Sequence, residues 1–86
     1  MTANERILKA LANRRRLSLV STLKRRGSAT VGELAAVLKV TLPTTSKHLA
    51  ILGSADVVEY ERRSLQVHYR LADDLPSLAR SIIKHL

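Results

Sequence analysis

The first half of the chain repeats apolar residues every three or four positions, which is the spacing of one face of an α-helix. The pattern predicts a short first helix capped by Asn4 and, after a break near Asn13, a second helix from about Arg14 to Arg26. Gly27 follows, at a position where helices commonly end on a left-handed residue. The positions expected to point inward are Ile7, Leu8 and Leu11 in the first helix and Leu17, Val20 and Leu23 in the second.

Two further helices follow closely, and the start of each is marked. Thr30 and Glu33 have the spacing of a capping box, which predicts a short helix ending near Lys39. Thr41 is the expected cap of the next helix, and Pro43 is tolerated in its first turn because an N–H there has no helical partner. The inward positions are Val31, Leu34, Ala35 and Leu38 in the third helix and Leu42, Thr45, Leu49 and Leu52 in the fourth.

After residue 56 the apolar spacing changes to alternation, which predicts β-strands. Residues 57–62 and 65–71 form two expected strands joined by a turn at Arg63-Ser64, and Leu65 begins the apolar face of the second. Asp73 or Asp74 is the expected cap of a last helix, whose apolar positions are Leu75, Leu78, Ile82 and Leu86. The expected fold is mainly α with a small β-hairpin (α+β): a single domain over residues 1–86, with a helix-turn-helix followed by a two-stranded wing.

Composition narrows the function. The chain has 15 Lys and Arg against 7 Asp and Glu, a net charge of +8, which favours a polyanionic partner: nucleic acid first, an acidic membrane second. It has no cysteine, so thiolate metal sites and thiol nucleophiles are excluded. Two tyrosines are the only aromatic residues, which argues against single-strand binding by base stacking. No catalytic motif is present, no membrane span or signal peptide is expected, and we do not expect an enzyme.

Four segments resemble the sequence motifs of the ArsR family of winged-helix repressors. Residues 8–17 read LKALANRRRL and are similar to the family's opening, while residues 31–35 read VGELA and resemble its third helix. Residues 46–52 read SKHLAIL and resemble the recognition helix, and residues 67–71 read VHYRL and resemble the second wing strand. Each motif alone is weak, but their common order and spacing across nearly the whole chain make the resemblance specific.

The resemblance implies a homodimeric transcriptional regulator of bacteria or archaea that binds a pseudo-palindromic operator, with the first and last helices forming the dimer interface. Its expected location is cytoplasmic and nucleoid-associated. Three positions depart from the family pattern. Asp56 and Ser64 stand where glycine is usual, before the wing and at its tip, and Thr45 replaces a residue that is commonly apolar.

The candidate DNA contacts lie on the outer face of the fourth helix and at the wing tip. Lys47 points almost opposite to the inward face, where it can reach a guanine edge or a phosphate. The alternatives are an ordinary solvated helix face and, for the wing arginines, a charge pair that keeps an edge strand from aggregating. For His48, a partly buried ring bonded to backbone is as good an interpretation as a phosphate contact. The candidates are Thr41, Pro43, Thr44, Ser46, Lys47, His48, Arg62 and Arg63.

The terminal helices carry more apolar residues than a small winged domain needs internally, which favours a two-fold dimer interface; the alternative is that both pack only on their own domain. The candidate interface residues are Ile7, Leu8, Leu11, Leu78, Ile82, Ile83 and Leu86. Many ArsR-family repressors respond to metals through cysteines or Asp and His pairs. Here Ala35, Ala36 and Val37 stand at the thiolate positions, and we predict no metal site and no cofactor.

The leading hypothesis is a dimeric repressor that reads double-stranded DNA. A rival is a winged helix that assembles with an acidic protein, and a third is a basic protein that coats nucleic acid without sequence preference. The net positive charge does not identify the surface that would contact DNA bases. Most of it lies in residues 1–26, which hold eight basic residues and one acidic residue and precede the helix-turn-helix.

Overall fold

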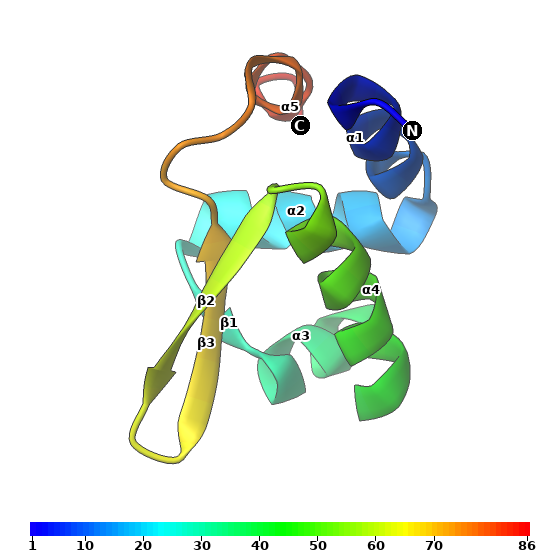
Figure 1. Cartoon of the computed structure of the whole chain (residues 1–86). Helices are drawn as coiled ribbons and strands as arrows, with labels where there is room; N and C mark the ends of the chain where they lie inside the picture. Colours follow the sequence, from blue (N-terminus) through cyan, green and yellow to red (C-terminus); the bar gives the residue numbers. More distant parts are fainter.

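Five helices surround one apolar core, and a small antiparallel sheet extends from one side as a wing (Figure 1). The computed structural model describes all of residues 1–86. The elements are α1 (Ala3–Leu11), α2 (Arg14–Arg26), β1 (Ala29–Thr30), α3 (Val31–Leu38), α4 (Leu42–Ser54), β2 (Val58–Arg63), β3 (Gln66–Leu71) and α5 (Ser77–Ile83). The predicted bounds of the second helix are confirmed, and the helix-turn-helix is α3 followed by α4.

Polar caps begin four of the helices. The predicted capping box at Thr30 is confirmed: its hydroxyl accepts the Glu33 N–H at 3.2 Å, and the Glu33 carboxylate accepts the Thr30 N–H at 2.8 Å. Asn13 and Thr41 cap α2 and α4. The prediction for α1 is wrong, because Thr2 rather than Asn4 is the N-cap and forms a second capping box with Glu5. The capping box of Thr2 and Glu5 therefore places the start of α1 two residues earlier than predicted.

The last helix also begins elsewhere than predicted. It starts at Ser77 after Pro76, with no side-chain cap, so neither Asp73 nor Asp74 serves as one. Asp73 is held by the wing instead, since its N–H donates to Glu59 Oε1 at 2.9 Å. The far end of α5 is secured by Lys24, whose ammonium donates to the Ile83 and Leu86 carbonyls at 3.0 Å each.

The sheet has three strands rather than the two predicted, in the order β1-β3-β2. The extra strand is the two-residue β1, where Ala29 lies opposite Tyr69 and Thr30 opposite His68. A strand this short leaves no alternation for a sequence pattern to detect. It ties the start of α3 to the wing, so the wing is fixed to the helix-turn-helix by backbone pairing.

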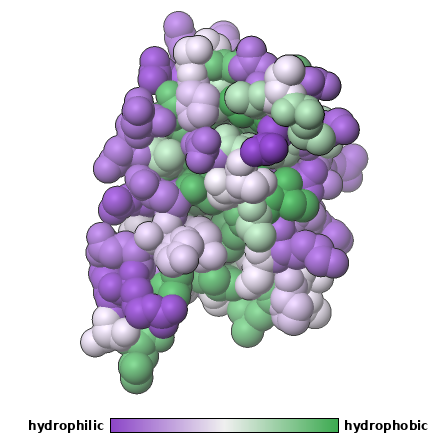
Figure 2. All heavy atoms as spheres, in the orientation of Figure 1, coloured by the Kyte–Doolittle hydropathy of each residue, from purple (hydrophilic) through white to green (hydrophobic).

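The core is filled mainly by the residues that the spacing placed inward, and Leu34, Leu49 and Leu52 are essentially inaccessible. Three predictions of inward positions are wrong. Leu42, in the first turn of α4, is 54% exposed, and Leu8 of α1 is 51% exposed. Leu65 is 97% exposed, because the hairpin turn falls at Ser64-Leu65, one residue later than predicted. Figure 2 shows the resulting apolar tip at the far end of the wing.

Both departures from family glycines adopt left-handed backbone conformations. Asp56 has φ +61° and Ser64 has φ +56°. Asp56 follows the α4 C-cap, where its own N–H donates to the Gly53 carbonyl and the Val57 N–H donates to the Leu52 carbonyl, both at 3.0 Å. This Schellman pattern normally has glycine at the left-handed position. No helix in the chain is both long and apolar enough to cross a lipid bilayer.

Candidate nucleic-acid interface

Helix α4 separates an apolar inner face from a small polar outer face. Thr45, Leu49 and Leu52 are buried, while Pro43, Ser46 and Lys47 are exposed. The buried threonine costs little because its hydroxyl donates to the Thr41 carbonyl at 3.0 Å, so no polar atom is left unpaired. This explains how threonine stands at a commonly apolar position. The exposed face has one charge, at Lys47, and one large apolar side chain, Ile51, which is 37% exposed and lies about 40° around the helix from Lys47.

The first turn of α4 uses two of the candidate residues for its own structure. The Thr41 hydroxyl accepts the Thr44 N–H at 3.3 Å and donates to the Thr44 hydroxyl at 2.9 Å. Thr41 is therefore a cap, and Thr44 is half-buried with one acceptor position already used. The side chains of Ser46 and Lys47 are exposed and make no hydrogen bond within the chain, so their polar groups are free for a partner.

The half-buried ring of His48 contacts the side chain of Arg16 rather than the backbone. Its Nδ1 lies 3.3 Å from Nη1 of Arg16, whose Nε donates to the Ala10 carbonyl at 2.6 Å and whose Nη2 donates to the Lys9 carbonyl at 3.2 Å. Burial, together with the positive charges of Arg16 and Arg15, lowers the pKa of His48 below its usual 6.5. The ring is therefore neutral at pH 7 and can accept the Arg16 N–H. Arg16 thus links the end of α1 to the middle of α4.

The two wing arginines lie on opposite faces of the hairpin. Arg62 shares a face with Tyr60 and Val58, opposite Val67, Tyr69 and Leu71 of β3, and it makes no ion pair. Arg63 lies on the other face, where its Nε donates to Glu61 Oε1 at 2.5 Å. The sequence interpretation treats them as one cluster, and strand alternation separates them.

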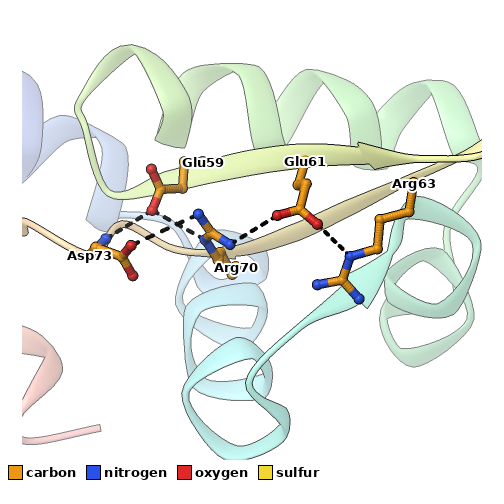
Figure 3. A network of polar contacts seen from close by, with 5 residues as sticks. All are labelled: Glu59, Glu61, Arg63, Arg70 and Asp73. Atoms are coloured by element: carbon orange, nitrogen blue, oxygen red, sulfur yellow. Dashed lines mark hydrogen bonds and ion pairs between the residues drawn. The ribbon is translucent and has the colours of Figure 1, made fainter.

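The face that carries Arg63 is a compensated network (Figure 3). Arg70 donates to Glu59 at 3.2 Å and to Glu61 at 3.5 Å, and it lies 3.8 Å from Asp73. Hydrogen bonds from the Asp73 backbone and from Arg70 lower the pKa of Glu59, and the Arg63 guanidinium lowers the pKa of Glu61. Carboxylates that remain ionised cancel the positive charge here, so this side of the wing does not attract a polyanion.

The opposite face of the wing leads directly to α4. A cavity of about 460 Å³ lies between them, bordered by Ala50 and Gly53 of α4 and by Tyr60 and Tyr69 of the wing. The two tyrosine rings are packed with centroids 5.5 Å apart. Arg62 therefore lies on the wing face that borders this cavity through Tyr60, and α4 forms the other side of the cavity.

The candidate dimer residues divide by burial. Ile7, Leu11 and Ile83 are buried in the chain's own core, Leu78 and Ile82 are half-buried, and Leu8 and Leu86 are exposed. Helices α1 and α5 contact each other at the end of the molecule away from the wing tip (Figure 1). Of the candidate residues, only Leu8 and Leu86 are exposed, and the exposed Met1 precedes α1.

No group of three or more histidine, aspartate or glutamate side chains comes together in the positions needed to hold a metal ion. Asp73 and Asp74, considered from the sequence, are placed at the base of the wing rather than along α5. Sequence reasoning missed Arg16, which stands out from the sequence only as part of the basic run Arg14–Arg16. Its position soon after the last buried leucine of α1 does not reveal a contact with His48, 32 positions away.

The comparisons with known proteins agree with this geometry. The family described as "Bacterial regulatory protein, arsR family" matches residues 13–60. The biofilm growth-associated repressor of Agrobacterium fabrum is 44% identical over 68 residues, covering 79% of this chain and 57% of the relative. The arsenical resistance operon repressor of Escherichia coli is 34% identical over 77 residues, covering 90% of this chain and 66% of the relative. The chain spans less than two thirds of the length of these curated relatives.

Solved structures are similar over nearly the whole fold. The transcriptional repressor BigR from Xylella fastidiosa has a TM-score of 0.79 and is 36% identical, with 98% of this chain and 84% of that chain covered. The homodimeric winged helix-turn-helix DNA-binding domain Mb0332 from Mycobacterium bovis has a TM-score of 0.83 and is 30% identical, with coverages of 96% and 73%. The fold is therefore a winged helix-turn-helix. The family match covers residues 13–60, which is more than half of the chain. The chain therefore belongs to the ArsR family of bacterial regulatory proteins, which is a family of regulators and not of enzymes.

Proposed function

We propose that the protein is a sequence-specific, double-stranded DNA-binding transcriptional regulator, acting as a homodimeric repressor. The observation that carries this proposal is the free positive charge on two neighbouring elements. The Lys47 side chain is exposed on the outer face of α4, and the unpaired Arg62 guanidinium lies on the wing face that borders α4 through Tyr60. An α-helix with a small polar outer face fits the major groove, and an arginine on a ribbon fits a neighbouring phosphate or the minor groove. The curated relatives are named repressors, which supports the same function.

In this proposal α4 supplies sequence readout and the wing supplies affinity. Lys47 reaches base edges from the centre of the outer face, with Ser46, Pro43 and Thr44 beside it. Thr41 and His48 act through structure: Thr41 caps α4, and His48 holds α4 against α1 through Arg16. Arg62 contacts the DNA backbone, and Arg63 contributes less because Glu61 already pairs with it.

The homodimer is proposed on two grounds. Apolar side chains remain exposed on α1 and at the end of the chain after α5, and the similar domain from Mycobacterium bovis is homodimeric. A two-fold axis near these helices would set two copies of α4 about 34 Å apart, one turn of DNA. We further propose that the dimer works without a metal and in the cytoplasm, at the nucleoid. A zinc or nickel titration that revealed a tight, stoichiometric, dimer-dependent site would overturn the metal-free proposal.

Selection of duplexes from a random pool, followed by affinity measurements over a range of salt concentrations, tests the function. A DNA reader enriches a defined pseudo-palindromic sequence, binds it with a steep dependence on salt, and prefers it to random competitor by a factor of roughly 10³ or more. Binding with a steep salt dependence but no enriched sequence would instead identify a non-specific coating protein. Absence of duplex binding would favour assembly with an acidic protein partner.

A further inference from the structure

The first turn of α2 has an unfavourable charge arrangement. Its first three residues are Arg14, Arg15 and Arg16, and no acidic residue lies in that turn. The N-terminal end of a helix carries the positive end of its dipole, so acidic side chains stabilise it and basic ones destabilise it. The opposite end of α2 has the favourable arrangement, with Lys24, Arg25 and Arg26 in its last turn. A local arrangement that opposes stability is often retained for function.

Only one of the three arginines has an evident structural role. Arg16 is half-buried and donates to two carbonyls of α1 and to His48. Arg14 and Arg15 are exposed, and neither makes an ion pair or a side-chain hydrogen bond within the chain. Elsewhere Arg26, Arg63 and Arg70 are paired with carboxylates. The two free guanidinium groups therefore face solvent without internal compensation.

Arg15 lies near the flank of α4 opposite the wing, and Arg14 precedes it in the first turn of α2. Successive helical residues turn by about 100°, so Thr44 and His48 lie to one side of Lys47, and Ser46 and Ala50 lie to the other. The wing borders the second side, where Ala50 lines the cavity with the tyrosines and Ser46 lines a hollow with wing residues. The start of α2 borders the first side, because Arg16 contacts His48 there and the charge of Arg15 is close enough to act on that ring.

We propose that Arg14 and Arg15 form a phosphate-binding site that holds the DNA backbone on the side of α4 opposite Arg62. The duplex is then gripped from both flanks, by the wing on one side and by the start of α2 on the other. This inference rests on the proposed DNA binding and adds a second contact surface to it. The phosphate charges also neutralise the unfavourable cluster at the helix N-terminus, so binding relieves the repulsion that the free protein carries.

The test compares Arg14→Gln and Arg15→Gln with Arg25→Gln. Arg25 is a matched control because it is exposed and unpaired and lies on the same helix. Its replacement by glutamine removes one positive charge, as the other two replacements do. It stands eleven positions away from Arg14, which is about 16 Å along the helix axis. Affinity for an enriched duplex and for a random duplex is measured against salt concentration, and the midpoint of thermal unfolding is measured without DNA.

Arg14→Gln and Arg15→Gln are each expected to weaken binding to both duplexes by a similar factor and to lower the slope of log affinity against log salt by about 0.9 for each phosphate that is no longer neutralised. The unfolding midpoint is expected to stay the same or rise, because a repulsive charge is removed, whereas removal of a structural residue would lower it. Arg25→Gln is expected to leave the salt slope unchanged.

If all three variants show the same salt slope as the wild type, while the wild type still selects a sequence, this inference is wrong and the proposed function stands. If the wild type selects no duplex, both are wrong.

Discussion

Neighbouring arginines at the wing tip have different surroundings because side chains alternate across a β-strand. Arg62 lies on the wing face that it shares with Tyr60 and has no carboxylate partner, whereas Arg63 lies on the opposite face and is paired with Glu61. A sequence pattern can find both residues and can predict the hairpin. It does not settle which arginine faces the helix, because the register depends on where the turn falls, and a shift of one residue exchanges the two faces.

Replacement of each arginine by alanine distinguishes them. Arg62→Ala is expected to weaken binding to enriched and random duplexes alike and to lower the salt slope by about 1, since one phosphate is no longer neutralised. Arg63→Ala is the matched control and is expected to have a clearly smaller effect, because its guanidinium is already neutralised. Equal losses of affinity for the two variants in a fluorescence-anisotropy titration would contradict the assignment of faces.

The second residue-scale prediction concerns backbone strain. Asp56 holds the left-handed position that ends α4, and side chains other than glycine pay roughly 1–2 kcal/mol there. Asp56→Gly is therefore expected to raise the free energy of unfolding by about 0.5–1 kcal/mol, after the greater freedom of glycine in the unfolded chain is allowed for. Urea unfolding measures the change. Asp74→Gly is the control, because Asp74 does not have a positive φ, and it is not expected to stabilise the fold.

At the scale of the element, sequence predicted the starts of α2, α3 and α4 and missed those of α1 and α5. Thr30 and Glu33 form the expected box because both partners lie within four residues of each other. The caps of α1 and α5 differ from the predicted ones for different reasons. Thr2 is selected because Glu5, three residues later, completes a capping box, which is a local signal that the choice of Asn4 overlooked. Asp73 is held by Glu59 of the wing, 14 positions away.

The capping box of α3 has a pH dependence. The pKa of Glu33 lies below its ordinary 4.5, chiefly because the carboxylate accepts the Thr30 backbone N–H, with the Thr30 side chain and Arg26 adding to it. Since the folded state favours the ionised form, this contribution is present above pH 4.5 and is lost as the pH falls through and below that value. Glu33→Gln keeps the box but loses the charge. It is expected to lower the urea midpoint slightly at pH 7, and this difference from the wild type is expected to shrink progressively as the pH falls below 4.5.

The same carboxylate pattern recurs at Glu5, whose pKa is lowered by the Thr2 backbone and side chain. Wild-type and Glu33→Gln proteins should therefore both lose stability in acid, and the wild type should lose more. If the difference between their urea midpoints were the same under neutral and acidic conditions, ionisation of Glu33 would not contribute to the stability of α3.

At the scale of the whole molecule, the proposed dimer depends on how many apolar side chains of the terminal helices remain exposed. Sequence spacing placed seven apolar residues in the candidate dimer interface, but Ile7, Leu11 and Ile83 are already used by the chain's own core. Periodicity identifies an apolar stripe, and it does not say whether its neighbour belongs to the same chain or to a second one. The exposed residues Leu8 and Leu86 are the ones left for a partner.

Leu8→Glu tests the proposed dimer. Because Leu8 is half exposed, a charge there is expected to leave the protomer folded and to raise the dimer dissociation constant by about a hundredfold, the cost of burying an unpaired charge in an apolar interface. Sedimentation velocity at micromolar concentration measures the change. Val37→Glu is the control, since Val37 is an exposed apolar residue of α3, away from α1 and α5. A wild-type protein that sediments as a monomer at tens of micromolar would contradict the dimer.

In the proposed function α4 reads base sequence through its outer face, so the ratio of affinities for an enriched duplex and a scrambled duplex depends on that face. Lys47→Ala removes the one charge on that face without touching the core. The ratio is expected to fall by about tenfold to a hundredfold, corresponding to roughly 1–3 kcal/mol for one base contact, while affinity for the scrambled duplex changes much less. An unchanged ratio in Lys47→Ala, with the wild type still selecting its sequence, would show that the reading surface lies elsewhere.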